Sequence, residues 1–213
     1  GGGIYSLNSE INFSGAFITN IIQNDATING GGIYLKSSLI SGSYLNISHN
    51  NSTQDGGGVF IDDSGKLLLS ETKINNNTAI EDGGAINLNG YNTELELNYC
   101  KITNNLSETS SILYANNGII EINNTLIEGN RSYNYPGGIL AKNSNTSLLN
   151  ITMAENKVNN PSAGGNLNIE QYGSLNIINS IIWNNDGVEL YLKSDGFPKS
   201  VLTTHTTLDN GRD

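Results

Sequence analysis

The sequence predicts an all-β chain wound into a right-handed, single-stranded parallel β-helix (a β-solenoid) of about seven to eight coils of ~27 residues each. Three observations predict this fold. A glycine-rich motif recurs at a fixed period, a second motif ending in Asn recurs in phase with it, and short alternating apolar segments lie between the two. Stacked repeats of this kind bury a continuous core that no single repeat could bury alone.

The first motif is a run of small residues, mostly glycines, followed by an aliphatic residue. Its starts are Gly1, Gly30, Gly56, Gly83, Ser110, Gly137 and Gly164, with a weaker eighth start at Gly187. Glycine adopts positive φ at little cost, so the motif predicts a tight turn or a close backbone approach. The aliphatic residues that follow are expected to stack into one inward column: Ile33, Val59, Ile86, Leu113, Leu140 and Leu167.

In the second motif, an apolar residue is followed after two spacers by Asn. The motif ends at Asn50, Asn77, Asn105, Asn130, Asn156 and Asn185, and Phe17 to Asn20 is the nearest match in the first coil. Asn satisfies backbone groups in turns and tolerates left-handed backbone. Stacked in register, these amides are expected to bond one another as a structural ladder.

Apolar residues at every second position between the motifs indicate strands, as in Leu67/Leu69 and Ile120/Ile122. Each repeat therefore offers three short strands: one after the glycines, one in the middle and one before the Asn. Coils stacked ~4.8 Å apart would form a rod of roughly 35 Å. Parallel crossovers of this type are almost always right-handed.

The repeats are expected to occupy residues 1–196, and residues 197–213 to form an irregular C-terminal coil or a cap. Because the chain opens on a repeat motif, we expect it to be a piece of something longer. The terminal coils would expose unpaired strand edges. Either more protein lies upstream, or copies stack head-to-tail into a fibre, since heterologous contacts of that kind build open filaments.

Composition excludes several classes of partner. The formal net charge is −10, and the ten Lys and Arg residues are dispersed, which argues against nucleic acid as a partner. No apolar run approaches the ~20 residues of a membrane helix, so this segment is not expected to insert into a membrane. Cys100 is the one cysteine, so an internal disulfide is impossible, and its place two residues before Ile102 predicts an inward, inert thiol.

The two motifs together, GGA[ILV]-like and FxxN-like, resemble the repeats of chlamydial polymorphic outer-membrane proteins and of the wider group of right-handed β-helix surface proteins. The resemblance covers residues 1 to about 186. It implies an exported autotransporter passenger that acts in adhesion. The chain differs from that family by lacking a membrane β-barrel and by carrying Ser110-Ser111 and Met153 at motif positions.

The rival interpretation is a carbohydrate-active β-helix of the pectate-lyase-like type, which binds or cleaves polysaccharide. Cleavage would need calcium-binding acids with a basic residue, or paired carboxylates around a water. The one adjacent pair of aspartates, Asp62-Asp63, would point to opposite faces of a strand, and neither Arg131 nor Arg212 lies in a matching context. We therefore expect no catalytic residues and no enzyme activity.

Two weak candidate sites remain. Tyr5, Tyr34, Phe60 and Tyr114 fall next to the buried column, so alternation places them outside, where they would either stack on sugar rings or pack across coils. Asp55 and Asp82 would lie about one strand spacing apart, which suggests a weak Ca²⁺ site. No other cofactor is expected.

Candidate glycosylation sequons are numerous. Those expected to be open to modification are Asn12, Asn46, Asn76, Asn123, Asn145 and Asn150. The sequence as a whole predicts an extracellular or cell-surface module, a rigid shaft or an adhesin passenger. Its expected partners are glycans, cell surfaces or copies of itself.

Overall fold

The computed structural model describes residues 1–160, 166–193 and 200–209, and it confirms the predicted fold. The described chain is all-β, without a helix, and forms a parallel β-solenoid of about seven turns with a spacing of ~27 residues. Each strand pairs in parallel with its counterparts in the neighbouring turns. The axial stacking therefore supplies the backbone hydrogen bonds that a single turn lacks.

Sheet A contains the strands that follow the glycine motif and the middle strands. Its first stack is β1 (Ile4–Leu7), β5 (Ile33–Lys36), β9 (Val59–Asp62), β13 (Ile86–Asn98), β16 (Leu113–Asn123), β19 (Ile139–Lys142), β23 (Leu167–Glu170) and β26 (Leu190–Leu192). Its second stack is β2 (Glu10–Phe13), β6 (Leu39–Ser43), β10 (Lys66–Ser70), β20 (Asn145–Leu149), β24 (Ser174–Ile178) and β27 (Ser200–Thr204). The long strands β13 and β16 run through both stacks and join them into one sheet.

Sheet B holds the strands that precede the Asn motif. They are β3 (Thr19–Ile22), β7 (Leu45–Ser48), β11 (Lys73–Asn75), β14 (Lys101–Thr103), β17 (Leu126–Glu128), β21 (Thr152–Ala154), β25 (Ile181–Trp183) and β28 (Thr207–Leu208). Sheet C holds a fourth, two-residue strand per turn that the sequence pattern did not predict. Its members are β4 (Asp25–Ala26), β8 (Asn51–Ser52), β12 (Thr78–Ala79), β15 (Leu106–Ser107), β18 (Arg131–Ser132) and β22 (Lys157–Val158).

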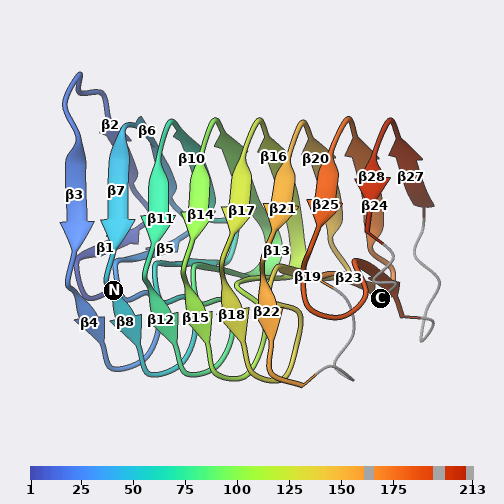
Figure 1. The fold of residues 1–213 in the computed structure, drawn as a ribbon. Coiled ribbons are helices and arrows are strands. Elements are labelled where there is room, and N and C mark those ends of the chain that lie inside the picture. The colour runs from blue at the N-terminus through green and yellow to red at the C-terminus, as the bar shows by residue number, and fades with distance from the viewer. Residues whose placement is uncertain (161–165, 194–199, 210–213) are drawn as a thin grey trace.

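The winding is right-handed. In Figure 1 the turns advance from the N-terminus at the left toward the C-terminus at the right, while the chain descends the near face in sheet B and ascends behind it. Strands β27 and β28 continue the stacks of β24 and β25, so residues 200–208 extend the solenoid. The expected boundary between residues 196 and 197 lies outside the described residues.

The core is a set of aliphatic columns that run along the axis. Sheet B contributes Ile21, Ile47, Ile74, Ile102, Ile127, Met153 and Ile182, all buried. Sheet A contributes Ile33, Val59, Ile86, Leu113 and Leu167, as predicted, but its sixth member is Ile139. The prediction of Leu140 was wrong by one residue, because Pro136 occupies the first glycine position and Gly137-Gly138 align with the second and third. Leu140 instead pairs with Tyr114 on the outer side, where it is fully buried.

Cys100 lies in an inward column of both apolar and hydroxyl side chains, with Leu45, Thr72, Thr125, Ile151 and Ser180, and it is 2% exposed. The hydroxyls in this column bridge successive turns. Thr125 Oγ1 accepts a hydrogen bond from Cys100 N at 3.1 Å and donates to Asn123 O at 2.7 Å. Burial raises the pKa of the Cys100 thiol. The thiol is therefore an inward, protonated core group.

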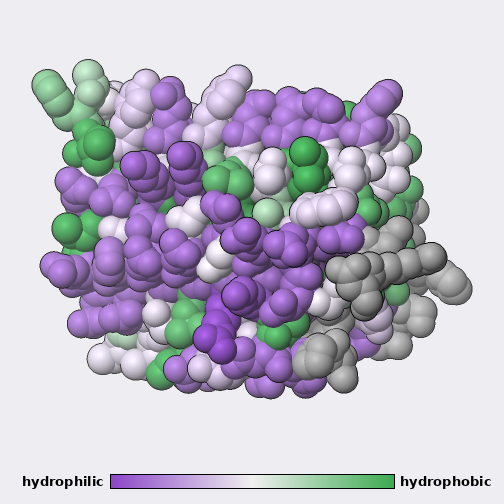
Figure 2. All heavy atoms as spheres, viewed as in Figure 1, coloured by the Kyte–Doolittle hydropathy of each residue, from purple (hydrophilic) through white to green (hydrophobic). Residues whose placement is uncertain are grey.

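Most of the face shown in Figure 2 is hydrophilic, with separate hydrophobic spots and no continuous apolar band. This face carries sheet B and sheet C (Figure 1). The outer positions of sheet B are mainly Asn, Lys, Thr and Glu. This face is therefore mainly polar, and the columns behind it are buried, as the strand alternation predicted.

Candidate functional site

The predicted aromatic column contains a stack of three rings. Tyr5, Tyr34 and Phe60 are Cα partners on β1, β5 and β9. Ring centroids lie 5.1 Å apart between Tyr5 and Tyr34 and 5.3 Å apart between Tyr34 and Phe60, with interplanar angles of 9° and 16°. Both faces of the Tyr34 ring are therefore covered, and Phe60 is only 2% exposed. The stack uses its ring faces for cross-coil packing, and only Tyr5 keeps an open face.

Tyr114, the fourth predicted aromatic residue, lies outside that stack. Asn87 separates it from Phe60 along the column. Lys142 Nζ lies 5.5 Å from the Tyr114 ring centroid and 3.7 Å from Glu170 Oε2. Burial, followed by the charges of nearby acids, raises the pKa of Tyr114 to about 12. This tyrosine belongs to a half-buried polar cluster in which it stays protonated.

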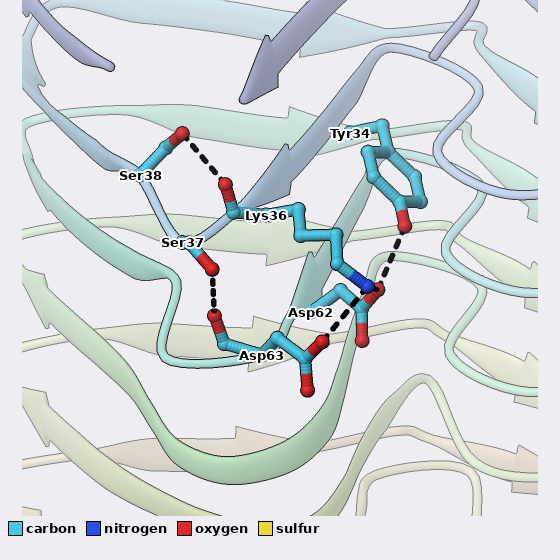
Figure 3. Close-up of polar contacts among 6 residues, drawn as sticks. All are labelled: Tyr34, Lys36, Ser37, Ser38, Asp62 and Asp63. Atoms are coloured by element: carbon cyan, nitrogen blue, oxygen red, sulfur yellow. Dashed lines mark hydrogen bonds and ion pairs between the residues drawn. The ribbon is translucent and has the colours of Figure 1, made fainter. Parts of the chain in front are cut away.

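A second polar cluster lies beside the aromatic stack, on β5 and the end of β9 (Figure 3). The Tyr34 hydroxyl donates to Asp62 Oδ2 at 2.8 Å, and Lys36 Nζ lies 3.0 Å from Asp62 Oδ2 and 2.8 Å from Asp63 Oδ2. Burial and the bond to Asp62 raise the pKa of Tyr34 to about 12, and the two carboxylates raise the pKa of Lys36. Both carboxylates of the Asp62-Asp63 pair are thus paired with one cation. That arrangement is an ion-pair network, without a free base placed opposite an acid. The expectation that the two side chains point to opposite faces of a strand was wrong, because β9 ends at Asp62 and Asp63 follows it with φ 35°.

Asp55 and Asp82 lie in neighbouring turns, as the sequence predicted. Asp55 Oδ1 accepts a hydrogen bond from Asp82 N at 2.9 Å, and Asn29 Oδ1 accepts one from Asp55 N at 3.1 Å. Burial raises the pKa of Asp55 to about 6, opposed by the bond from Asp82 N, and burial also raises the pKa of Asp82. Asp55 Oδ1 accepts a hydrogen bond from the backbone of the next turn, as the neutral side chain of Asn29 does one turn earlier. These residues therefore form a hydrogen-bonded ladder along the turns. Among the described residues, no group of three or more His, Cys, Asp or Glu side chains could hold a metal ion.

The Asn ladder runs through every predicted member. Each Oδ1 accepts both the backbone N and Nδ2 of the preceding Asn, as Asn130 Oδ1 does from Asn105 at 3.0 Å for each bond. Each Nδ2 also donates to a backbone carbonyl of the preceding turn, for example from Asn105 to Ile74 O at 2.9 Å. The predicted ladder residues Asn50, Asn77, Asn105, Asn130 and Asn156 are all at most 1% exposed. The first turn joins the ladder through Asn24, which bonds Asn50 Oδ1, so the match at Phe17 to Asn20 was wrong, and Phe17 is 86% exposed.

Burial separates the sequons into two groups. Asn12, Asn76, Asn145 and Asn150 are exposed, while Asn46 and Asn123 are partly buried. Asn46 Nδ2 donates to Asn20 Oδ1 at 3.0 Å, and Asn150 Nδ2 donates to Asn124 Oδ1 at 2.9 Å. A glycan on Nδ2 would replace those donors, so Asn12, Asn76 and Asn145 are the most accessible acceptors on geometric grounds.

A groove that the sequence analysis missed lies on the turns that lead into sheet B. Figure 1 shows these turns at its upper edge. Two adjoining hollows of ≈ 430 Å³ and ≈ 510 Å³ share Tyr44, Glu71 and Lys73. Tyr99 and Lys101 extend the groove along the axis in one direction, and Ile18 and Asn46 extend it in the other. Aligning the repeats on the Asn motif would have placed Tyr44 with Tyr99, and Lys73 with Lys101, in shared columns.

Comparison with protein-family models finds no match, and comparison with curated proteins finds none either. Within the described ranges, no helix is long and apolar enough to span a membrane. Two features of the described residues have consequences for function: the axial ladders and the groove on the turns.

Proposed function

We propose that the chain is an extracellular structural and adhesive module, a rigid β-solenoid shaft that carries a ligand-binding surface. The observation that carries this proposal is the Asn ladder, which bonds each turn from Asn24 to Asn185 to the next. Each rung combines a side chain–side chain bond with two bonds to the backbone. Such fully satisfied, buried polar networks rigidify the structure that contains them.

The surface is consistent with a passive, exposed role. The acids considered for catalysis or for calcium binding are tied to cations or to backbone N–H groups, as Asp62 is to Lys36 and Asp55 is to Asp82 N. The resemblance of the GGA[ILV]-like and FxxN-like motifs to polymorphic outer-membrane protein repeats supports export and adhesion. The exposed sequons, such as Asn145, are compatible with either a bare or a glycosylated surface.

Polysaccharide binding without cleavage is the second candidate, favoured by the groove at Tyr44 and Tyr99. These rings are 41% and 62% exposed, whereas Phe60 is closed by stacking. Exposed aromatic rings beside polar side chains form surfaces on which sugar rings stack. This function is compatible with the shaft, because the groove runs along the axis and leaves the core columns intact.

The shaft proposal is tested by small-angle X-ray scattering of the purified chain, together with a reducing-sugar assay on acidic and neutral polysaccharides. We expect scattering that fits one rigid cylinder, and release of reducing sugar no greater than the blank. A flexible or expanded particle would overturn the shaft. Sugar release would favour a polysaccharide-cleaving solenoid instead.

A further inference from the structure

The groove is built on one turn position that recurs along the solenoid. Tyr44, Glu71, Tyr99, Asn124, Asn150 and Asn179 occupy it in successive turns. The backbone N of each donates to the carbonyl that precedes the equivalent residue of the next turn, as Tyr44 N does to Ser70 O at 3.2 Å. All six have positive φ, between 48° and 59°. We call this set the turn column.

Asn is the low-cost residue for this backbone conformation, and three turns use it. Asn150 Nδ2 donates to Asn124 Oδ1 at 2.9 Å, and Asn179 Nδ2 donates to Asn150 Oδ1 at 2.8 Å, which forms an outer amide ladder. A bulky residue with positive φ is uncommon and strained. Tyr44, with φ 59°, and Tyr99, with φ 55°, therefore occupy positions where Asn would suit the backbone better. Such strain tends to occur where a side chain serves function.

Two lysines lie beside the tyrosines, and within the described part of the chain neither has an anionic partner. Lys73 and Lys101 are exposed Cα partners on β11 and β14. Neither forms an ion pair with any described residue, although Lys36, Lys66 and Lys142 do. The two side chains leave the backbone about one strand spacing apart, so their ammonium groups repel each other, and an anion between them would relieve that repulsion.

The remaining polar residues of the groove are Glu71, Thr72 and three amides, those of Asn20, Asn46 and Asn75. Glu71 accepts a hydrogen bond from the Tyr44 hydroxyl, and this bond raises the pKa of Tyr44. Its carboxylate and the amides of Asn46 and Asn75 line the same hollow as Tyr44 and Lys73. The groove thus combines exposed rings, hydrogen-bonding groups and an unpaired cationic pair on a chain whose net charge is −10.

We propose that this groove binds an anionic polysaccharide, a chain of uronic acid sugars laid along the solenoid axis. Tyr44 and Tyr99 would stack on sugar rings, while Lys73 and Lys101 would bind a carboxylate between them. The inference rests on the adhesive part of the proposed function and names the ligand class of that surface.

The spacing of the column fits such a chain. Tyr44 and Tyr99 are two turns apart, a distance of roughly 10 Å along the axis. This is comparable to the length of a disaccharide unit in an extended β-1,4-linked chain, so alternate sugars would meet the two rings. Glu71 lies in the turn between them and offers a hydrogen-bond acceptor to sugar hydroxyls. The lysines lie two residues beyond Glu71 and Tyr99, on the outer face of sheet B.

The test uses isothermal titration calorimetry of the full chain with a hexamer of β-1,4-linked glucuronic acid, and with cellohexaose as the neutral match. We expect the uronate to bind at least ten-fold more tightly than cellohexaose. We expect the double variant Lys73→Met/Lys101→Met to lose most of that preference. The double variant Tyr44→Asn/Tyr99→Asn should bind the uronate at least ten-fold more weakly.

The tyrosine variant separates binding from folding, because Asn suits the turn column better than Tyr. Its midpoint of thermal unfolding should equal or exceed that of the parent while its affinity falls. Tyr172→Asn and Lys157→Met are the matched controls, since both residues are exposed outside the groove, and both variants should bind as the parent does. The proposal is overturned by absent uronate binding, by equal affinity for cellohexaose, or by unchanged affinity in either double variant. If the chain binds neither oligosaccharide but scatters as a rigid cylinder, the proposed binding site is wrong and the proposed shaft is still supported.

Discussion

The carboxylate of Glu189 receives both donors of Asn185: Nδ2 lies 2.8 Å from Oε2, and the backbone N lies 3.2 Å from Oε1. In the preceding turn the same two donors of Asn156 meet Asn185 Oδ1 at 2.9 Å each. Glu189 is 4% exposed, and burial raises its pKa while the bonds from Asn185 lower it. Glu189 therefore takes the place of a further ladder amide and ends the ladder at Asn185.

Glu189→Ala removes this end group and leaves two donors of Asn185 without an acceptor. Since unpaired donors that are partly shielded from water are costly, we expect the free energy of unfolding to fall by about 1–3 kcal/mol. Urea denaturation measures the change, and Glu121→Ala, at an exposed strand position, should shift it by less than about 0.5 kcal/mol. Equal stability of the two variants would show that Glu189 does not cap the ladder.

Asn105→Ala interrupts the ladder at its centre. The change removes the bonds that Asn105 Nδ2 donates to Ile74 O and Asn130 Oδ1. It also leaves Asn77 N and Asn77 Nδ2 without their acceptor, Asn105 Oδ1, which lies 3.0 Å from each. We expect a loss of about 2–4 kcal/mol in the free energy of unfolding. Asn89→Ala, at an exposed position of β13, serves as the control and should be nearly neutral. A ladder variant as stable as this control would contradict the structural role of the amides.

Asp55→Asn distinguishes a turn ladder from a calcium site. The folded pKa of about 6 lies above the ordinary 3.8, so the folded state holds more protons between these values. The stabilising contribution of Asp55 is therefore present below pH ~4 and is lost as the pH rises through ~6. An Asn keeps the acceptor for Asp82 N without the charge. We expect the variant to gain about 1–2 kcal/mol at pH 7, discounted for partial exposure, and nothing at pH 4.

Thermal unfolding of the parent and of Asp55→Asn, measured with calcium chloride and with EDTA, decides between a turn ladder and a calcium site. If Asp55 and Asp82 held Ca²⁺, calcium would raise the midpoint of thermal unfolding of the parent, and Asp55→Asn would abolish the rise. The ladder interpretation expects no calcium dependence in either protein.

Cys100 provides a probe of the core. Its thiol is buried and its pKa is raised, so little thiolate is present or accessible at neutral pH. We expect no reaction with a thiol reagent such as dithionitrobenzoate in the folded state and stoichiometric reaction in urea. Rapid labelling of the native chain would mean that sheet B opens locally at β14.

The sequence predicts the fold because the period-two alternation and the axial period are both explicit in it. The errors arise where the repeats can be aligned in two ways. Gly137-Gly138 can be aligned with the first two or with the last two glycines of a triplet. The first alignment places Leu140 in the inward column, whereas the structure has Ile139 there. Two apolar-x-x-Asn motifs lie four residues apart in the first turn, and only the pairing of Ile21 with Ile47 selects the second.

The candidate sites were harder to predict, because they depend on what covers each outer position. Alternation places Phe60 outside the strand, but its neighbours in the column bury it. The groove depends on turn residues such as Tyr44 and Tyr99, which carry no alternation signal and come together only through the register of β7, β11 and β14. The axial ladder, in contrast, needed only an Asn at a fixed phase, so its six predicted members were found.

The most direct test of the central claim, that the ladder makes the turns one rigid body, is native-state hydrogen exchange resolved to single amides. The account expects the backbone amides of Asn50 through Asn156 to exchange together, through one global opening, with faster exchange only at the terminal turns. Amides of neighbouring central turns that exchange independently, at widely different rates, would contradict a shaft held rigid by the ladder.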